Sequence, residues 1–537
     1  MTPEKKRRLR RVLLAVSLIF FGLLLYAAWP GTITYTISAE TTYATEPIDA
    51  EGRVDYVAAL NTRLRGDITP EQNANVLIWQ AIGPHPEGKT LPDEYFQWLG
   101  RPAPPEDGEY FVPWEKFLTD KAVAEGEDAP TVEELAEHNA RRERALTWPW
   151  AATDEPDLAE WLAKNAKPLA LLKQASTKPS YYNPLVSRRL ATEDARLMLA
   201  PLPNVQVYRA MANLLVCRAM LHLKTGHFNE AWQDLLASHR LGRLVEMGST
   251  LIEHLVGVSV QKTAIQGETI FLSQAKLSAS QLACCRSDLL NLPLGACVAD
   301  SLNISDRFTM LDSLQAVALI GPDSLNEEGS RPRPPRASPG LFTRSINWDP
   351  AMLLINNWYD RWIAAARLTD YKERERAMGQ LVFEIKNMVR EVKGGTSNTR
   401  YFSAKERGEF AGKAVLGLTF PAVHLMVGAE TRNTQRHHNL SIAFALAAYR
   451  IDHSKYPPTL AELAPKYLAE IPKDEFTNGE LKYRLTATGY LLYSVGPNGT
   501  DDEGRGSENT PRGDDVSLEM PAQEPLKKPE KPDEPQE

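Results

Sequence analysis

The stretch NLLVCRAMLHLKTGHFNEAWQDLLASHRL, residues 213–241, decides the predicted fold class. Apolar residues recur at helical spacing on both sides of Gly226, which gives a helix–turn–helix pattern over residues 207–240. Gly226 permits a tight turn, and Ala231 lets the two helices approach each other closely. We therefore expect a mainly α protein whose body is built from helical hairpins.

Gly226, Phe228 and Ala231 are spaced in a way that resembles the turn and second helix of a tetratricopeptide repeat. The preceding helix lacks the Trp and Leu-Gly positions of that repeat, and no 34-residue recurrence follows. We favour a generic helical hairpin over a repeat array.

Helical patterns extend outward from this hairpin. Residues 158–172, 190–199 and 351–392 fit amphipathic helices, whereas 331–340, RPRPPRASPG, indicate an exposed linker. Capping-box patterns at Thr69 and Thr131 predict two helices in an aromatic-rich first region. The predicted organisation is 1–30 basic tip and anchor, 31–150 mixed region, 151–320 helical domain, 321–350 linker, 351–411 helical segment, 412–519 C-terminal module and 520–537 disordered tail.

The N-terminus predicts a membrane anchor. Residues 12–29 are uncharged and close with Tyr26 and Trp29, and about 18 apolar residues are near the minimum for a transmembrane helix. The basic residues that precede this segment are Lys5, Lys6, Arg7, Arg8, Arg10 and Arg11. This asymmetry places the N-terminus in the cytoplasm and the bulk of the chain outside it, as a single-pass signal-anchor protein. A cleaved signal peptide is the alternative, although Tyr26-Ala27-Ala28 is a poor cleavage site.

Overall charge and cysteine content exclude some classes of function. The formal net charge is −8, and the dense basic cluster is confined to the N-terminus, so we expect no nucleic-acid partner. The cysteines form no Cys-x-x-Cys motif. Two interpretations stay open: buried free thiols, or a disulfide that pairs Cys297 with Cys285 or Cys217. The four cysteines are Cys217, Cys284, Cys285 and Cys297.

A second informative region lies near the C-terminus. An apolar segment from residue 414 runs into a helix that ends near 449–452, and a capping-box pattern at Thr459 predicts a short helix. Residues 481–485 and 490–495 alternate in the manner of strands around Thr488-Gly489, which predicts a β-hairpin. An Asp- and Gly-rich loop follows. We expect a small α+β module.

The order of these elements resembles the major pseudopilins, the G-type, of type II secretion, over about a fifth of the chain. The matching residues are Tyr449, Arg450, Asp452, Tyr456, Pro457, Ile471, Pro472, Lys473, Asp474, Tyr493, Ser494, Gly496, Asn498 and Gly499. In that family the final acidic loop binds calcium. The resemblance implies that Asp501, Asp502, Asp514 and Asp515 hold calcium here, although the insert GRGSENTPRG separates the two pairs; a solvated acidic loop is the alternative.

The chain departs from that family in its layout. Pseudopilins carry the long helix at their N-terminus after a prepilin cleavage site, whereas here the module lies some 400 residues downstream. We therefore expect no polymerisation as a pilin. The overall layout also resembles that of uncharacterised bacterial membrane-anchored proteins.

No familiar catalytic motif occurs in the sequence. His-Glu-x-x-His, Gly-x-Ser-x-Gly, Walker and dinucleotide-binding patterns are all missing, and adjacent His437 and His438 face different directions on a helix. The leading hypothesis is a membrane-tethered extracytoplasmic interaction or scaffold protein with other envelope proteins as partners. The alternatives are an envelope hydrolase, with a site between the helical body and the first region, and a component of a secretion or pilus-like assembly.

Overall fold

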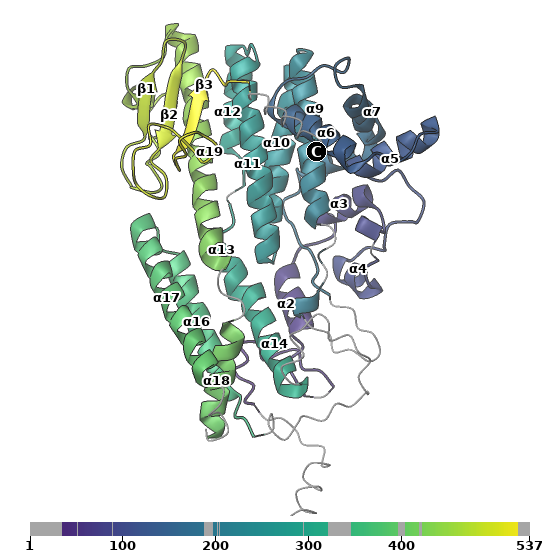
Figure 1. The fold of residues 1–537 in the computed structure, drawn as a ribbon, viewed down its shortest axis with the longest axis vertical. Coiled ribbons are helices and arrows are strands. Elements are labelled where there is room, and N and C mark those ends of the chain that lie inside the picture. Colours follow the sequence, from purple (N-terminus) through teal and green to yellow (C-terminus); the bar gives the residue numbers. More distant parts are fainter. Residues whose placement is uncertain are drawn as a thin grey trace, which may run out of the picture.

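The computed structural model describes residues 35–50, 52–88, 90–186, 197–200, 202, 205–293, 295–320, 345–395, 403–417 and 422–524. Within these ranges the protein is mostly helical, with one small sheet near the C-terminus (Figure 1). The predicted linker at 331–340 and most of the predicted tail and of the predicted helix 190–199 lie outside the described residues.

Three long helices form the centre of the body: α9 (Val205–Lys224), α10 (Phe228–Glu246) and α11 (Leu251–Gln274). The hairpin expected around Gly226 is present, and this residue has a φ of +79° in the turn between α9 and α10. Gly257 of α11 lies against the backbone of α10, because a Cβ at this position would come within 2.4 Å of the Glu246 nitrogen. Small residues therefore set the close spacing of these two helices.

The first region covers one side of this body with short helices. Their bounds are α2 (Tyr56–Arg65), α3 (Ala74–Ile82), η1 (Pro86–Gly88), α4 (Asp93–Leu99), α5 (Trp114–Glu125), α6 (Val132–Thr147), α7 (Pro156–Lys164) and α8 (Ala166–Ala175). Edge-to-face contacts of Trp79 with Tyr95 and Phe96 supply part of its core. The capping box at Thr131 is formed, but the predicted start at Thr69 is wrong, because α3 begins at Ala74 and is capped by the Asn73 side chain.

A second helical core lies in the lower half of Figure 1. Its arm of three helices is α16 (Asp349–Ala366), α17 (Tyr371–Gly395) and α18 (Ala404–Leu416), which we call the α16–α18 arm. The remaining elements of the two cores are η2 (Leu197–Leu199), α12 (Ala279–Leu290), α13 (Val298–Ser301), the π-helix η3 (Leu302–Asp306) and α14 (Arg307–Ile320).

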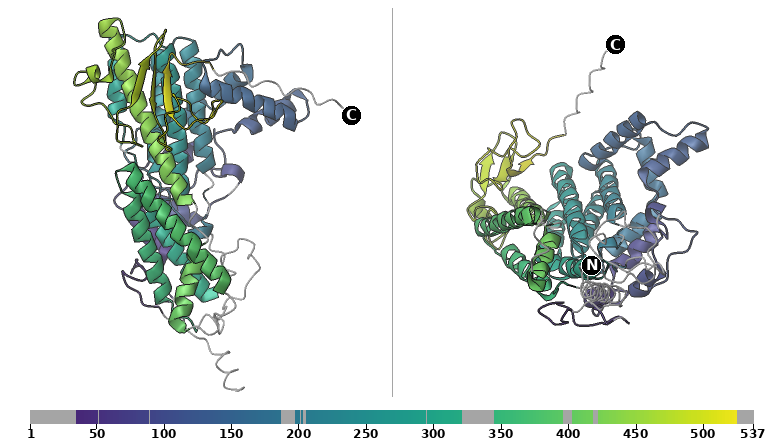
Figure 2. Two further views of the ribbon diagram at one scale, coloured as in Figure 1. Left: turned by 60° about the vertical axis from the view of Figure 1, so that its left-hand side comes forward. Right: turned by 60° about the horizontal axis from the view of Figure 1, so that its bottom comes forward.

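The C-terminal module combines one long helix with a three-stranded antiparallel sheet. The helix α19 (Ala422–His453) packs on the strands β2 (Tyr490–Ser494) and β3 (Val516–Met520), and β1 (Lys482–Leu485) completes the order β1-β2-β3. Leu485 pairs with Tyr490, and Tyr490 pairs with Met520. In Figure 2 (right) the sheet and the helices α5–α7 lie at opposite ends of an arc of helices.

Several predictions for this module need correction. The helix expected from residue 414 is divided, because α18 ends at Leu416 and α19 begins at Ala422. Thr459 precedes a short 3₁₀ helix, η7 (Leu460–Leu463), without the predicted side-chain cap. The hairpin is present, but the third strand β3 was not predicted. It forms because the acidic loop returns the chain alongside β2.

The predicted fold class is also wrong in its transmembrane helix. Among the described residues no helix is both long and apolar enough to cross a membrane, so these residues do not support the single-pass membrane description. The long buried helices carry charges instead; α11, for example, contains Glu253, Lys262 and Glu268. Residues 12–29, on which the prediction depends, lie outside the described residues.

Candidate metal centre

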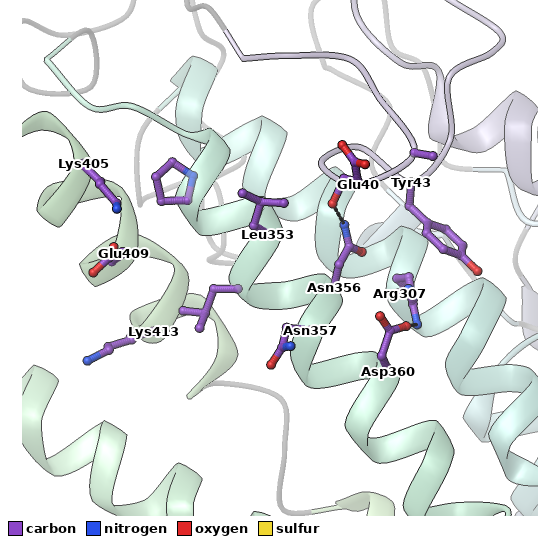
Figure 3. A pocket seen from close by; sticks show the side chains of 13 residues that line it. Glu40, Tyr43, Arg307, Leu353, Asn356, Asn357, Asp360, Lys405, Glu409 and Lys413 are labelled. Atoms are coloured by element: carbon purple, nitrogen blue, oxygen red, sulfur yellow. Dashed lines mark hydrogen bonds and ion pairs between the residues drawn. The ribbon is translucent and has the colours of Figure 1, made fainter.

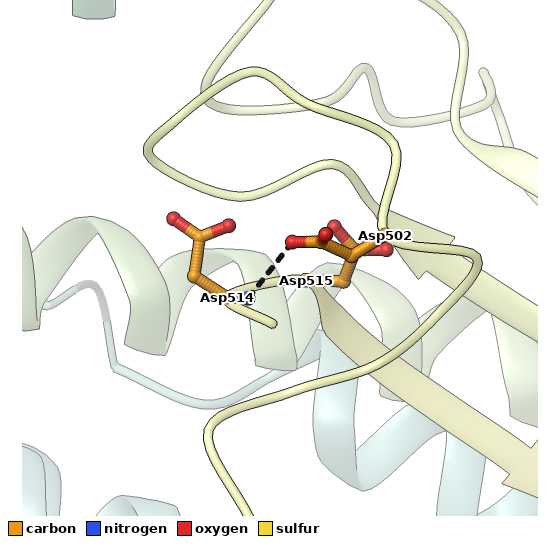
Figure 4. Close-up of side chains that lie close together, drawn as sticks. All are labelled: Asp502, Asp514 and Asp515. Atoms are coloured by element: carbon orange, nitrogen blue, oxygen red, sulfur yellow. Dashed lines mark hydrogen bonds between the residues drawn. The ribbon is translucent and has the colours of Figure 1, made fainter. Parts of the chain in front are cut away.

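Three of the four predicted calcium ligands come together in the loop between β2 and β3. One carboxylate oxygen from each of Asp502, Asp514 and Asp515 lies within 4.8 Å of the others. Figure 4 shows that Asp502 comes from one limb of the loop, whereas Asp514 and Asp515 precede β3 on the other limb. The insert GRGSENTPRG therefore folds out as a loop and leaves the two limbs adjacent.

Asp501, the fourth predicted ligand, has a different role. Its Oδ1 accepts hydrogen bonds from the Tyr493 hydroxyl and the Glu503 N–H, each at 3.0 Å, and its Oδ2 lies 3.7 Å from the Lys482 Nζ. The Glu503 N–H is the main cause that lowers the pKa of Asp501. Asp501 thus fixes the loop to β1 and β2 outside the carboxylate cluster.

Backbone contacts between the two limbs hold the cluster. The Asp514 N–H donates to Oδ2 of Asp502 at 3.3 Å, and the Gly504 N–H donates to Oδ2 of Asp515 at 2.8 Å. Gly513 lies so close to the other limb that a Cβ at this position would be 2.3 Å from the Arg505 carbonyl oxygen. The loop therefore needs glycine at this position so that the limbs can approach.

Two carboxylate oxygens of the cluster are buried without a hydrogen-bond partner among the described residues. They are Oδ1 of Asp514 and Oδ1 of Asp515, and the Asp515 residue is only 5% exposed. Buried polar atoms are rarely left without a partner, and those that lack a protein partner usually contact a water or an ion. These oxygens distinguish the cluster from a solvated acidic loop.

The electrostatics of the cluster disfavour three free carboxylates. Burial raises the pKa of Asp515, and the neighbouring carboxylates of Asp502 and Asp501 act in the same direction. The nearby cation is Arg505, whose Nη2 lies 3.8 Å from Oδ1 of Asp502. A divalent cation would neutralise this excess negative charge.

The donor chemistry fits calcium. Ca²⁺ takes six to eight oxygen ligands and accepts mono- or bidentate carboxylates in flexible geometry, with carbonyls and water completing the shell. The cluster supplies only carboxylate oxygens, and nitrogen or sulfur ligands of the kind that zinc prefers are missing from it. The three side chains would bind the ion between the two limbs of the loop, and the ion would cross-link the limbs.

A groove of about 730 Å³ is a second candidate site (Figure 3). It lies between the loop 39–43, α16 and α18, with Lys405, Glu409 and Lys413 along the α18 wall. On the opposite wall Arg307 is buried, donates to Asp360 at 2.6 Å and lies 4.2 Å from the centre of the Tyr43 ring. These contacts hold the 39–43 loop to the helices.

The groove does not present a catalytic constellation. Asn356 uses its Nδ2 to bind the carbonyl oxygens of Glu40 and Thr41, at 2.7 and 2.8 Å. Asp360 is engaged by Arg307, and Lys413 lies 3.2 Å from Glu391. Arg307 thus contributes to the packing of the loop, and Lys413 joins α18 to α17.

Buried polar pairs in the helical body were not predicted. His239 and Glu268 are both fully buried, and Nδ1 of His239 lies 3.0 Å from each Glu268 oxygen. The ring of His437 lies 5.6 Å from that of His239, whereas His438 faces Glu475 at 3.2 Å. The sequence signal for these buried polar contacts is weak, because it consists of single polar residues inside apolar helical segments.

Glu253 is a buried structural residue of α11. Its Oε2 completes the capping box of α11 with Thr250, and its Oε1 accepts from Tyr181 and Asn183 at 3.0 and 2.6 Å. It therefore connects α11 to the first region.

The four cysteines are free thiols, so neither of the two disulfides considered from the sequence is present.

Comparison with known proteins adds no relative. No family model matches the chain, and no curated protein or solved structure is significantly similar to it.

Proposed function

We propose that this chain is an interaction protein whose C-terminal α+β module is stabilised by a calcium ion. The observation that carries the proposal is the convergence of Asp502, Asp514 and Asp515 with two buried oxygens that lack protein partners among the described residues. Calcium would neutralise the carboxylates and fix the loop. The ion has a structural role in this proposal, and the helical surfaces bind the partner.

The arrangement of the module supports the proposal. The resemblance to G-type pseudopilins implies a calcium loop after the hairpin, and the carboxylate cluster lies in the segment that follows β2. The long helix α19 backs the sheet, as the order of elements in that family leads us to expect. Neither the hydrolase nor the secretion-assembly alternative has a specific observation in its favour among the described residues.

Calorimetric titration of the full-length protein with CaCl₂ tests the proposal, with MgCl₂ as a second titrant. We expect one calcium ion per chain and weaker magnesium binding, because Mg²⁺ demands near-octahedral geometry and gives up its water reluctantly. Asp502→Asn and Asp515→Asn should each weaken calcium binding at least tenfold.

Glu508→Gln is the matched control, because Glu508 is an exposed carboxylate of the same loop outside the cluster. It should leave the calcium affinity within about twofold of the wild-type value. Equal effects of all three substitutions, or no heat of binding at millimolar calcium, would contradict the proposal.

A further inference from the structure

The carboxylate cluster is followed in the chain by a residue that packs on a helix from outside the module. Asp515 is followed directly by Val516, which begins β3 and forms a small core with Tyr371 and Phe476. Tyr371 is the first residue of α17, and this end of α17 points toward the sheet in Figure 1. The start of the α17 helix and the metal-bearing limb of the loop therefore share packing.

The contact between α17 and the module is specific. The rings of Tyr371 and Phe476 meet edge to face with their centres 4.8 Å apart, and both side chains are buried. Next to them, Nδ2 of Asn478 donates to Oδ2 of Asp370 at 2.6 Å. An apolar pair and a hydrogen bond thus position the first turn of α17 on the module.

Hydrogen bonds and close backbone packing link this contact to the carboxylates. Asp474 is buried and accepts from the Phe476 N–H with Oδ1 and from the Val495 N–H with Oδ2, at 2.8 and 3.1 Å. Directly after Val495, Gly496 packs against Asp514 so closely that a Cβ would lie 2.2 Å from the Asp514 carbonyl oxygen. Movement of Asp514 and Asp515 would be transmitted to Phe476 and Val516.

We infer that calcium binding at the Asp502–Asp514–Asp515 cluster and docking of the α16–α18 arm through Tyr371 are coupled, each strengthening the other. The inference rests on the calcium site proposed above and adds a regulatory role to it. Without the ion the carboxylates repel each other and loosen the start of β3, on which Tyr371 packs. With the ion, the backbone at Asp514 and Asp515 is fixed and the docking surface is complete.

Coupling between binding equilibria is reciprocal, so it can be measured from the calcium side. In the full-length protein, Tyr371→Ala should weaken calcium binding by roughly fivefold or more, which is the lower end of typical coupling factors. Phe383→Ala is the matched control, because Phe383 is an aromatic residue of the same helix that is 58% exposed. It should leave the calcium affinity unchanged.

The second measurement needs no substitution in α17. Hydrogen–deuterium exchange of the wild-type protein should slow in residues 371–378 when CaCl₂ is added, and Asp515→Asn should abolish this change. Calcium binding with unchanged exchange at 371–378 and equal affinities of the Tyr371 and Phe383 variants would overturn the coupling and leave the calcium site intact. Absence of calcium binding to the wild type would overturn both.

Discussion

Asp515→Asn should change stability in opposite directions depending on calcium. In EDTA the substitution removes one of three negative charges that lie within 4.8 Å of each other. At this distance and an effective dielectric constant of about 20, one like-charge pair costs about 3 kcal/mol. Partial exposure of Asp502 and the nearby Arg505 reduce this value, so we expect a net stabilisation of about 1–2 kcal/mol.

The replacement side chain preserves the local hydrogen bond. Asparagine can still accept from the Gly504 N–H, which donates to Oδ2 of Asp515 at 2.8 Å. Its amide can also donate to the carboxylates of Asp502 or Asp514. The predicted gain without metal therefore comes from lost repulsion and not from a changed fold.

With calcium the order should reverse. An ion at a hundredfold excess over its dissociation constant stabilises the folded state by about 2.7 kcal/mol, and the variant should lose most of this increment. Urea denaturation of both proteins, in EDTA and in calcium, measures the two differences. A variant that is less stable than the wild type in EDTA, and that gains equally from calcium, would contradict both the repulsion between the carboxylates and the role of Asp515 as a calcium ligand.

Three further predictions concern pH and packing. Because burial raises the pKa of Asp515 and calcium binds the ionised form, calcium affinity in titration calorimetry should fall as the solution is acidified toward the pKa of Asp515, and an affinity independent of pH down to that range would count against the site. Burial also raises the pKa of Glu430 to about 7 from an ordinary 4.5. The folded state therefore holds the Glu430 proton more tightly than the unfolded state does, and the free energy of unfolding falls as pH rises from about 4.5 to about 7. Glu430→Gln should therefore stabilise the protein by about 1–3 kcal/mol at pH 8 and by little at pH 4, as judged by urea denaturation. In thermal melts, Gly257→Ala should destabilise the protein by about 2 kcal/mol or more, since its Cβ would meet the Glu246 nitrogen. Gly379→Ala in α17, where a Cβ meets nothing within 4 Å, should not destabilise it.

Local patterns predicted the elements that depend on near neighbours in the chain. The turn at Gly226 and the capping box at Thr131 follow from the conformational freedom of glycine and from a side-chain hydrogen bond within one turn. The wrong start at Thr69 has the same origin, because Asn73 provides a competing cap four residues later. Sequence alone gives no measure of which cap the tertiary packing selects.

Three of the four predicted ligands in the acidic loop come together as a carboxylate cluster, and the family resemblance pointed to this loop. The resemblance could not separate Asp501 from Asp502, because only the fold shows that Asp501 meets Tyr493 and Lys482. The α17 contact was not predictable, because Tyr371 and Phe476 are about a hundred residues apart and neither carries a motif. Long-range packing of this kind leaves no local signal.

A crystal structure of the protein grown with CaCl₂ tests the calcium site directly. We expect one calcium ion bound by the carboxylates of Asp502, Asp514 and Asp515, at roughly 2.3–2.6 Å from their oxygens, with the Asp501 side chain outside the coordination shell. An ion held by Asp501 without Asp515, or a loop without calcium at saturating concentration, would contradict this expectation.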